Sequence, residues 1–106
     1  MNDNERNLYK KALTMKGEES QVTITIEEMA EAIHALSKYK RLKEGLCDEE
    51  KVMYNIISEL ADVQVMIEQM IVSFNNEDLF SRVRTEKLNR LRERLNKLDG
   101  GGFHGC

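Results

Sequence analysis

The chain has 106 residues, which corresponds to a single domain by length. Charged residues make up 33% of it and hydrophobic residues 41%, a balance that suits a soluble helical protein better than a disordered one. Proline is absent and aromatic residues account for only 6%, which favours long helices over a β-sandwich or barrel. We therefore expect an all-α fold.

Charge and cysteine content limit the partners and the compartment. The net charge of −3 argues against nucleic-acid binding by the whole surface. Cys47 and Cys106 are too few for a disulfide framework, so a reduced, cytoplasmic setting is expected. No signal peptide is visible, and the most apolar stretch, residues 63–74, is too short to span a bilayer, so we expect no membrane partner.

Two helices are expected in the first half of the chain. Residues 4–15 form a short amphipathic pattern that Gly17 interrupts. The following segment is ambiguous, because residues 22–26 alternate as in a strand. A longer stripe with helical spacing covers the same segment and extends beyond it: Val22, Ile26, Met29, Ile33 and Leu36. We therefore predict a helix over residues 19–42, which ends before Gly45.

A third helix is predicted after a short turn. Asp48 is a suitable N-cap for a helix that runs to about Phe74. Its methionines Met53, Met66 and Met70 are interpreted as core packing. The two asparagines that follow, at positions 75 and 76, are expected to break the chain before the next helix.

The fourth predicted helix covers residues 78–98. Its leucines are spaced three and four residues apart, like the seam of a coiled coil: Leu88, Leu91, Leu95 and Leu98. Gly100, Gly101 and Gly102 are predicted to end it. Residues 1–99 are therefore expected to form one domain, and residues 100–106 a flexible, glycine-rich tail.

Two short acidic patterns stand out in the predicted second and third helices. Glu28 and Glu31 form ExxE, and Glu59 and Asp62 form ExxD. Residues three apart on a helix project from the same side, so each pattern presents two carboxylates together. Both pairs are equally distant from Gly45 along the chain. In an antiparallel hairpin that turns there, Glu31 faces Glu59. Glu28 likewise faces Asp62.

The four acids point to a divalent cation. Apolar residues flank the acidic side of both helices, so the carboxylates are expected to be partly buried. Clustered carboxylates repel one another unless some are protonated or a cation lies among them. Ligation by carboxylate oxygens alone suits Mg²⁺ or Mn²⁺ rather than zinc. We therefore predict a metal site formed by Glu28, Glu31, Glu59 and Asp62.

Other candidate features have less support. Glu31 and His34 form ExxH, which occurs in di-iron carboxylate proteins. The second acidic pair has no matching histidine, so His34 is interpreted as a surface residue. His104 and Cys106 are metal-ligating types, but they are interpreted as part of the tail. The leucine seam and basic face of the fourth helix leave open an alternative function, a non-catalytic helical module that binds nucleotides or a partner protein.

Taken together, the acidic patterns resemble a known family. EEMAE at residues 27–31, followed by ELAD at residues 59–62, is similar to the EExxE and ExxD signature of the MazG-like all-α nucleoside triphosphate pyrophosphohydrolases. The likeness covers about residues 19–98 and includes the stretches IEEMAEAIHALSKYKR and NIISELADVQVMIEQM. The gap between the motifs, residues 32–58, is near the long end for this family.

The resemblance implies a four-helix MazG-like bundle whose central antiparallel hairpin carries the acidic site. It implies a Mg²⁺-dependent hydrolase, with Mn²⁺ as a possible substitute. The implied reaction converts an NTP or dNTP and water into a nucleoside monophosphate and pyrophosphate. The metal ligands carried over are Glu28, Glu31, Glu59 and Asp62. Glu27 and Glu59 are the expected catalytic carboxylates.

Basic side chains and a partner copy are also expected at such a site. Lys38, Lys87 and Arg90 are the candidates for binding the triphosphate. The second and third helices are apolar on most sides, and one four-helix chain cannot cover them. We therefore expect a homodimer or a homotetramer, with the site near the interface.

Overall fold

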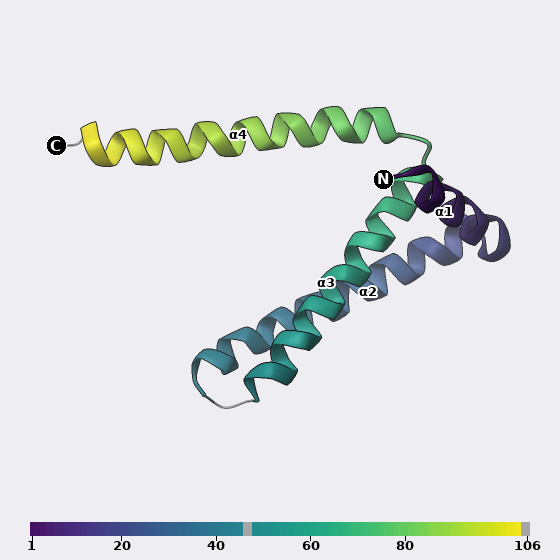
Figure 1. Ribbon diagram of the computed structural model, residues 1–106, viewed down its shortest axis with the longest axis horizontal. Coiled ribbons are helices and arrows are strands. Elements are labelled where there is room, and N and C mark those ends of the chain that lie inside the picture. The colour runs from purple at the N-terminus through teal and green to yellow at the C-terminus, as the bar shows by residue number, and fades with distance from the viewer. Residues whose placement is uncertain (46–47, 105–106) are drawn as a thin grey trace. The chain divides into compact units, whose positions relative to one another are not determined.

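The computed structural model describes residues 1–45 and 48–104. For Lys43 and residues 100–104 it describes the backbone but not the side chains. In these ranges the chain is helical and contains no strand, which confirms the predicted all-α class. The four helices, shown in Figure 1, are α1 (Asp3–Lys16), α2 (Glu18–Lys43), α3 (Glu49–Ser73) and α4 (Glu77–His104). The helical interpretation of residues 22–26 is therefore confirmed.

Contacts divide the chain into two compact units, Met1–Asn75 and Asn76–Cys106. The first unit contains α1, α2 and α3, and the second contains α4. The prediction of a single domain over residues 1–99 stays a prediction. No helix in the described ranges is long and apolar enough to cross a membrane.

Glycine and capping side chains set the limits of α1. The Asn2 side chain accepts a hydrogen bond from the Glu5 backbone N–H at 2.8 Å, and the Glu5 carboxylate accepts one from the Asn2 N–H at 3.1 Å. This reciprocal arrangement is a capping box. At the other end, the Gly17 N–H donates to the Leu13 carbonyl at 2.8 Å, with a φ of 87° that favours glycine. Gly17 alone therefore separates α1 from α2, whereas the predicted helices left residues 16–18 between them.

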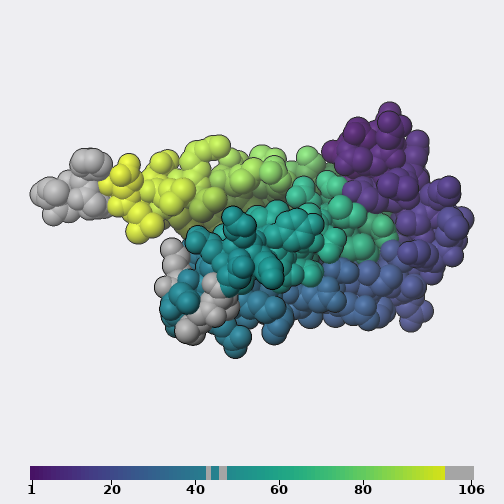
Figure 2. All heavy atoms as spheres, turned by 60° about the horizontal axis from the view of Figure 1, so that its bottom comes forward, coloured from purple at the N-terminus to yellow at the C-terminus, as the bar shows by residue number. Residues whose placement is uncertain are grey.

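The turn between α2 and α3 is close to the predicted one. Gly45 has a φ of 72°, and its N–H donates to the Leu42 carbonyl at 3.0 Å. Asp48 is the N-cap of α3, because its carboxylate accepts from the Lys51 N–H at 3.2 Å. The two helices run antiparallel, and their atoms lie in direct contact along the hairpin (Figures 1 and 2). α1 packs on α3 and, less extensively, on α2.

Small and polar side chains form much of the contact between α2 and α3. The buried residues of the two helices include Gln21, Thr25, Ala32 and Ala35 from α2, and Ile56, Met66, Gln69 and Met70 from α3. Ala32 and Ala35 let the two backbones approach closely. The acidic pairs lie on these same facing sides, so the hairpin interface and the predicted site coincide.

Large apolar side chains occupy the other side of the hairpin and are exposed. We refer to them as the outer face, which consists of Ile26, Met29, Ile33 and Leu36 from α2 and Met53, Ile57, Leu60 and Phe74 from α3. Ile33 is 70% exposed and Ile26 63%. The interpretation of Met53 as a core residue is therefore wrong, because Met53 is 39% exposed. Met66 and Met70 are buried as expected.

The second unit is a single long helix. α4 begins one residue before the predicted start and continues through the three glycines to His104. The prediction that Gly100 ends the helix is therefore wrong. Glycine allows helical dihedral angles but costs about 1 kcal/mol relative to alanine, so these residues weaken the helix without preventing it. Of the predicted tail, residues 100–106, the first five belong to α4, and Gly105 and Cys106 lie outside the described residues.

Candidate metal centre

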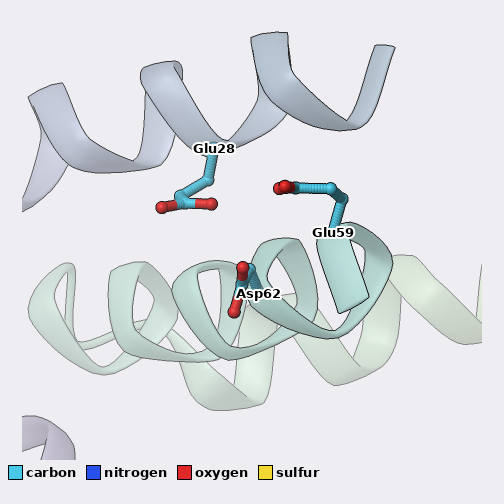
Figure 3. Close-up of side chains that lie close together, drawn as sticks. All are labelled: Glu28, Glu59 and Asp62. Atoms are coloured by element: carbon cyan, nitrogen blue, oxygen red, sulfur yellow. The ribbon is translucent and has the colours of Figure 1, made fainter. Parts of the chain in front are cut away.

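Three acidic side chains meet between α2 and α3. Glu28 from α2 and Glu59 and Asp62 from α3 each offer a carboxylate oxygen, and the three oxygens lie within 4.8 Å of one another. In Figure 3, Glu28 and Glu59 extend from opposite helices into the space between them, with Asp62 beside them on α3. The structure therefore brings together three of the four predicted metal ligands.

The register of the hairpin produces this meeting. Glu28 and Asp62 are equally distant from Gly45 along the chain, as the predicted turn requires. Gln21 and Gln69 are also equally distant from Gly45, and their side chains hydrogen-bond across the hairpin. The same pairing thus holds over several helical turns.

Two of the carboxylate oxygens are buried without a partner. The Oε2 atoms of Glu28 and Glu59 are inaccessible to solvent and form no hydrogen bond with any described residue. Asp62 is exposed, so the group is open to solvent on its side. Buried polar atoms without a partner are rare in native proteins, and they call for a water molecule, an ion or a ligand.

The electrostatic environment of the group is entirely acidic. Burial raises the pKa of Glu28, and repulsion from Glu31, Asp62 and Glu59 raises it further. Burial likewise raises the pKa of Glu59, with further contributions from Glu31 and Asp62. Every charged neighbour that shifts these two pKa values is another carboxylate. A bound cation is the simplest group that would relieve this repulsion.

Glu31, the fourth predicted ligand, lies beside the group but is not one of its three members. Its side chain is exposed, and repulsion from its charge contributes to the raised pKa of both Glu28 and Glu59. Glu31 is therefore close to a carboxylate on each helix. Its role as a metal ligand stays a prediction.

The other predicted site residues are more scattered. Glu27 is exposed and Lys38 half-buried on α2, and neither belongs to the three-carboxylate group. Lys87 and Arg90 are exposed on α4, in the second compact unit. His34 is exposed and lies outside the group, in agreement with its interpretation as a surface residue. The functional roles of Glu27 and of the three basic residues stay predictions.

The donor set fits a hard divalent cation. Mg²⁺ binds six oxygens at about 2.1 Å, so opposite ligand oxygens are about 4.2 Å apart. Among three ligands, however, at most one pair is opposite and neighbouring ligand oxygens are about 3.0 Å apart, so oxygens within 4.8 Å of one another would share one ion after movements of up to about 1 Å. The three members are all carboxylates, and the exposed side at Asp62 gives a phosphate oxygen or water room to bind.

Sequence reasoning missed one polar feature of the same interface. Gln21 and Gln69 are buried and hydrogen-bonded to each other. The available signal was positional, since Gln21, Thr25 and Glu28 follow at intervals of four and three on one side of α2. Gln69 similarly follows Asp62 after two helical turns.

Comparison of the chain with protein-family models, curated proteins and solved structures gives no match. The function is therefore inferred from the residues of this chain and from the motif resemblance described above.

Proposed function

We propose that this protein is a divalent-metal-dependent pyrophosphohydrolase that acts on nucleoside triphosphates. The observation that carries the proposal is the pair of unpartnered, buried oxygens on Glu28 and Glu59, beside the carboxylate of Asp62. Three acids from two helices would be unfavourable at this spacing without a cation. The motif resemblance supplies the substrate class, because the same residues match the metal-binding positions of the MazG-like signature.

Each acidic residue has a proposed role. Glu28, Glu59 and Asp62 would hold Mg²⁺ or Mn²⁺, with Glu31 as an additional ligand. When bound, the cation would neutralise phosphate charge and polarise the phosphate oxygens. The attacking water must lose a proton, and a nearby carboxylate is a suitable acceptor. By resemblance, Glu27 and Glu59 are the candidates for orienting that water or accepting its proton.

Positive charge is the second requirement of a triphosphate site. The groups that shift the pKa of Glu28 and Glu59 include no cation, so lysine or arginine must be supplied from farther away. Lys38 on α2 and the α4 residues Lys87 and Arg90 are the proposed donors. They would bind phosphate oxygens and leave the carboxylates to the metal.

A product assay tests the proposal. The purified protein is incubated with each common ribo- and deoxynucleoside triphosphate in the presence of Mg²⁺. We expect equal amounts of nucleoside monophosphate and pyrophosphate from at least one substrate, and no product after chelation of the metal. Absence of product from every substrate, with a folded protein confirmed by circular dichroism, would overturn the proposal.

We also propose that two copies associate through the outer face. Its eight apolar side chains leave on the order of 800 Å² exposed per copy, which is what one partner contributes to a standard interface. A typical monomer exposes a smaller continuous apolar patch, about 300–600 Å². The face takes residues from two helices, so pairing two copies about a twofold axis would form a four-helix arrangement. A tetramer would require a further surface.

A second candidate function rests on α4. Its leucine seam is exposed along its whole length, from Leu88 at 43% to Leu98 at 73%. An exposed seam of this kind suits a helical partner, as in a non-catalytic interaction module. Tight triphosphate binding without product formation would favour this alternative over the hydrolase.

A further inference from the structure

Two glutamine side chains are buried at the open end of the hairpin, away from its turn. Gln21 is 3% exposed and Gln69 5%, and the Gln69 amide Nε2 donates to the Gln21 Oε1. The Gln21 Nε2 is also buried, and it has no partner among the described residues. A pair of apolar side chains would fill this space without leaving a buried donor unpaired, so packing alone does not explain the glutamines.

The pair lies in line with the candidate metal centre. Gln21 and Glu28 share one side of α2, two turns apart, and Gln69 and Asp62 have the same relation on α3. The turn at Gly45 joins the helices at one end of the hairpin, and the amide pair joins them near the other. The acidic group lies between these two links.

We propose that Gln21 and Gln69 are positioning residues that fix the register of α2 against α3 and thereby set the spacing of the Glu28 and Asp62 carboxylates. The effect on metal binding rests on the function proposed above, whereas the effect on register does not. A single buried polar pair is known to specify register between packed helices.

The energetics favour one alignment over its neighbours. A slip of one helical turn displaces the helices by about 5.4 Å, which exceeds the 4.8 Å span of the three carboxylate oxygens. A slipped hairpin would therefore separate the acids. It would also separate the two amides, and a buried amide without a hydrogen-bond partner destabilises the fold. The apolar contacts discriminate less, because burial of Ala32, Ile56 or Met66 depends on area rather than direction.

The first test compares stability with metal affinity. In the double variant Gln21→Leu with Gln69→Leu, both amides are replaced by apolar groups of similar size. We expect a thermal midpoint equal to or above that of the wild type, but Mn²⁺ affinity reduced at least tenfold. Met66→Leu, a similar-volume change in the same interface, is the control and is expected to keep Mn²⁺ affinity within twofold. Wild-type affinity in the double variant would overturn the proposed effect on the metal site.

The second test reads register without any metal. Cysteines are introduced by Glu28→Cys with Asp62→Cys, or one turn out of register by Glu28→Cys with Met66→Cys, in a Cys47→Ser and Cys106→Ser background. With both glutamines present, the intramolecular disulfide should form mainly in the first pair. When Gln21→Leu and Gln69→Leu are added, the disulfide yield of the displaced pair relative to that of the first pair should rise at least fivefold.

An unchanged disulfide ratio would overturn the positioning role itself. If the ratio shifts but the wild type binds no Mn²⁺, the register inference stands and the proposed metal-dependent function fails. The two tests therefore separate the proposals.

Discussion

Glu28 and Asp62 belong to different helices, yet their carboxylate oxygens lie within 4.8 Å of each other. The meeting is a product of the hairpin register, not of sequence proximity. Like charges at this distance oppose folding unless a proton or a cation intervenes. The chain thus carries an unfavourable local arrangement at the site where the sequence pattern predicts chemistry.

Removing one carboxylate should uncouple stability from activity. Asp62→Asn keeps the size of the side chain but removes its charge. Mutation of a residue that only hydrogen-bonds to a metal ligand reduces metal affinity or activity by about 10–100-fold. Loss of a direct ligand should therefore lower the rate of pyrophosphate release at least tenfold. The helical circular dichroism signal should be unchanged. Glu86→Gln, on an exposed side of α4, removes one charge elsewhere and should retain full activity.

The raised pKa values predict an unusual pH dependence for the metal-free protein. The folded state binds protons at Glu28 and Glu59 more tightly than the unfolded state, for which the ordinary glutamate value is 4.5. The stability that these groups contribute is therefore complete below pH 4.5 and is lost as the pH rises through the raised values. Relative to Glu59→Gln, the thermal midpoint of the wild type in EDTA should fall from about pH 4 to pH 8.

Saturating Mg²⁺ should remove most of that fall, because a bound cation stabilises the ionised carboxylates. Thermal melts of both proteins over the same pH range, with EDTA or with Mg²⁺, give the comparison. If the thermal midpoints of wild type and Glu59→Gln differ by the same amount at every pH, the assigned environment of Glu59 would be contradicted.

A charge in the outer face should dissociate the proposed dimer. Ile33→Glu places a carboxylate at a position that is 70% exposed in one chain and would be buried between two. Light scattering at micromolar concentration should give a dimer mass for the wild type and a monomer mass for the variant. His34→Glu adds the same charge on a different side of α2 and should remain dimeric. A monomeric wild type would refute the assembly.

The contact between α1 and α3 should depend on one buried hydroxyl. Tyr9 is 5% exposed, and its Oη donates to the Glu68 carboxylate at 2.7 Å. Tyr9→Phe should lower the free energy of unfolding by about 1 kcal/mol, as measured by urea denaturation. Burial, followed by the hydrogen bond and charge of Glu68, raises the pKa of Tyr9 from 10.0 to about 12.

The hydroxyl of Tyr9 therefore contributes stability that is complete below pH 10 and lost as the pH rises toward 12. The Tyr9→Phe variant should show a weaker loss of stability than the wild type over that interval. Identical alkaline profiles would show that this hydrogen bond does not stabilise the fold.

Local sequence signals were sufficient for most helix ends and for the three members of the acidic group. Gly17, Gly45 and Asp48 mark helix ends through backbone conformation and capping, which depend on few neighbours. Their positions then aligned Glu28 with Asp62 by counting alone. The glycines after Leu98 misled, because glycine at a helix end is a preference and not a requirement.

The choice of buried face was harder to predict. α2 has bulky apolar residues such as Ile33 on one side and small residues such as Ala35 on the other, and it packs on α3 through the small side. Hydrophobicity alone would have predicted that the bulky apolar side of α2 is buried and the small side exposed. The role of Gln21 was missed for a related reason, since one sequence does not reveal which polar residues are buried.

Mn²⁺ binding tests the central claim most directly. Electron paramagnetic resonance titration of the wild type should show Mn²⁺ bound by the folded chain and displaced by Mg²⁺. Glu59→Gln and Asp62→Asn should each weaken this binding at least tenfold, whereas Glu86→Gln should leave it unchanged. Equal Mn²⁺ affinity in all four proteins, or no binding by the wild type, would contradict the assignment of Glu28, Glu59 and Asp62 as a metal centre.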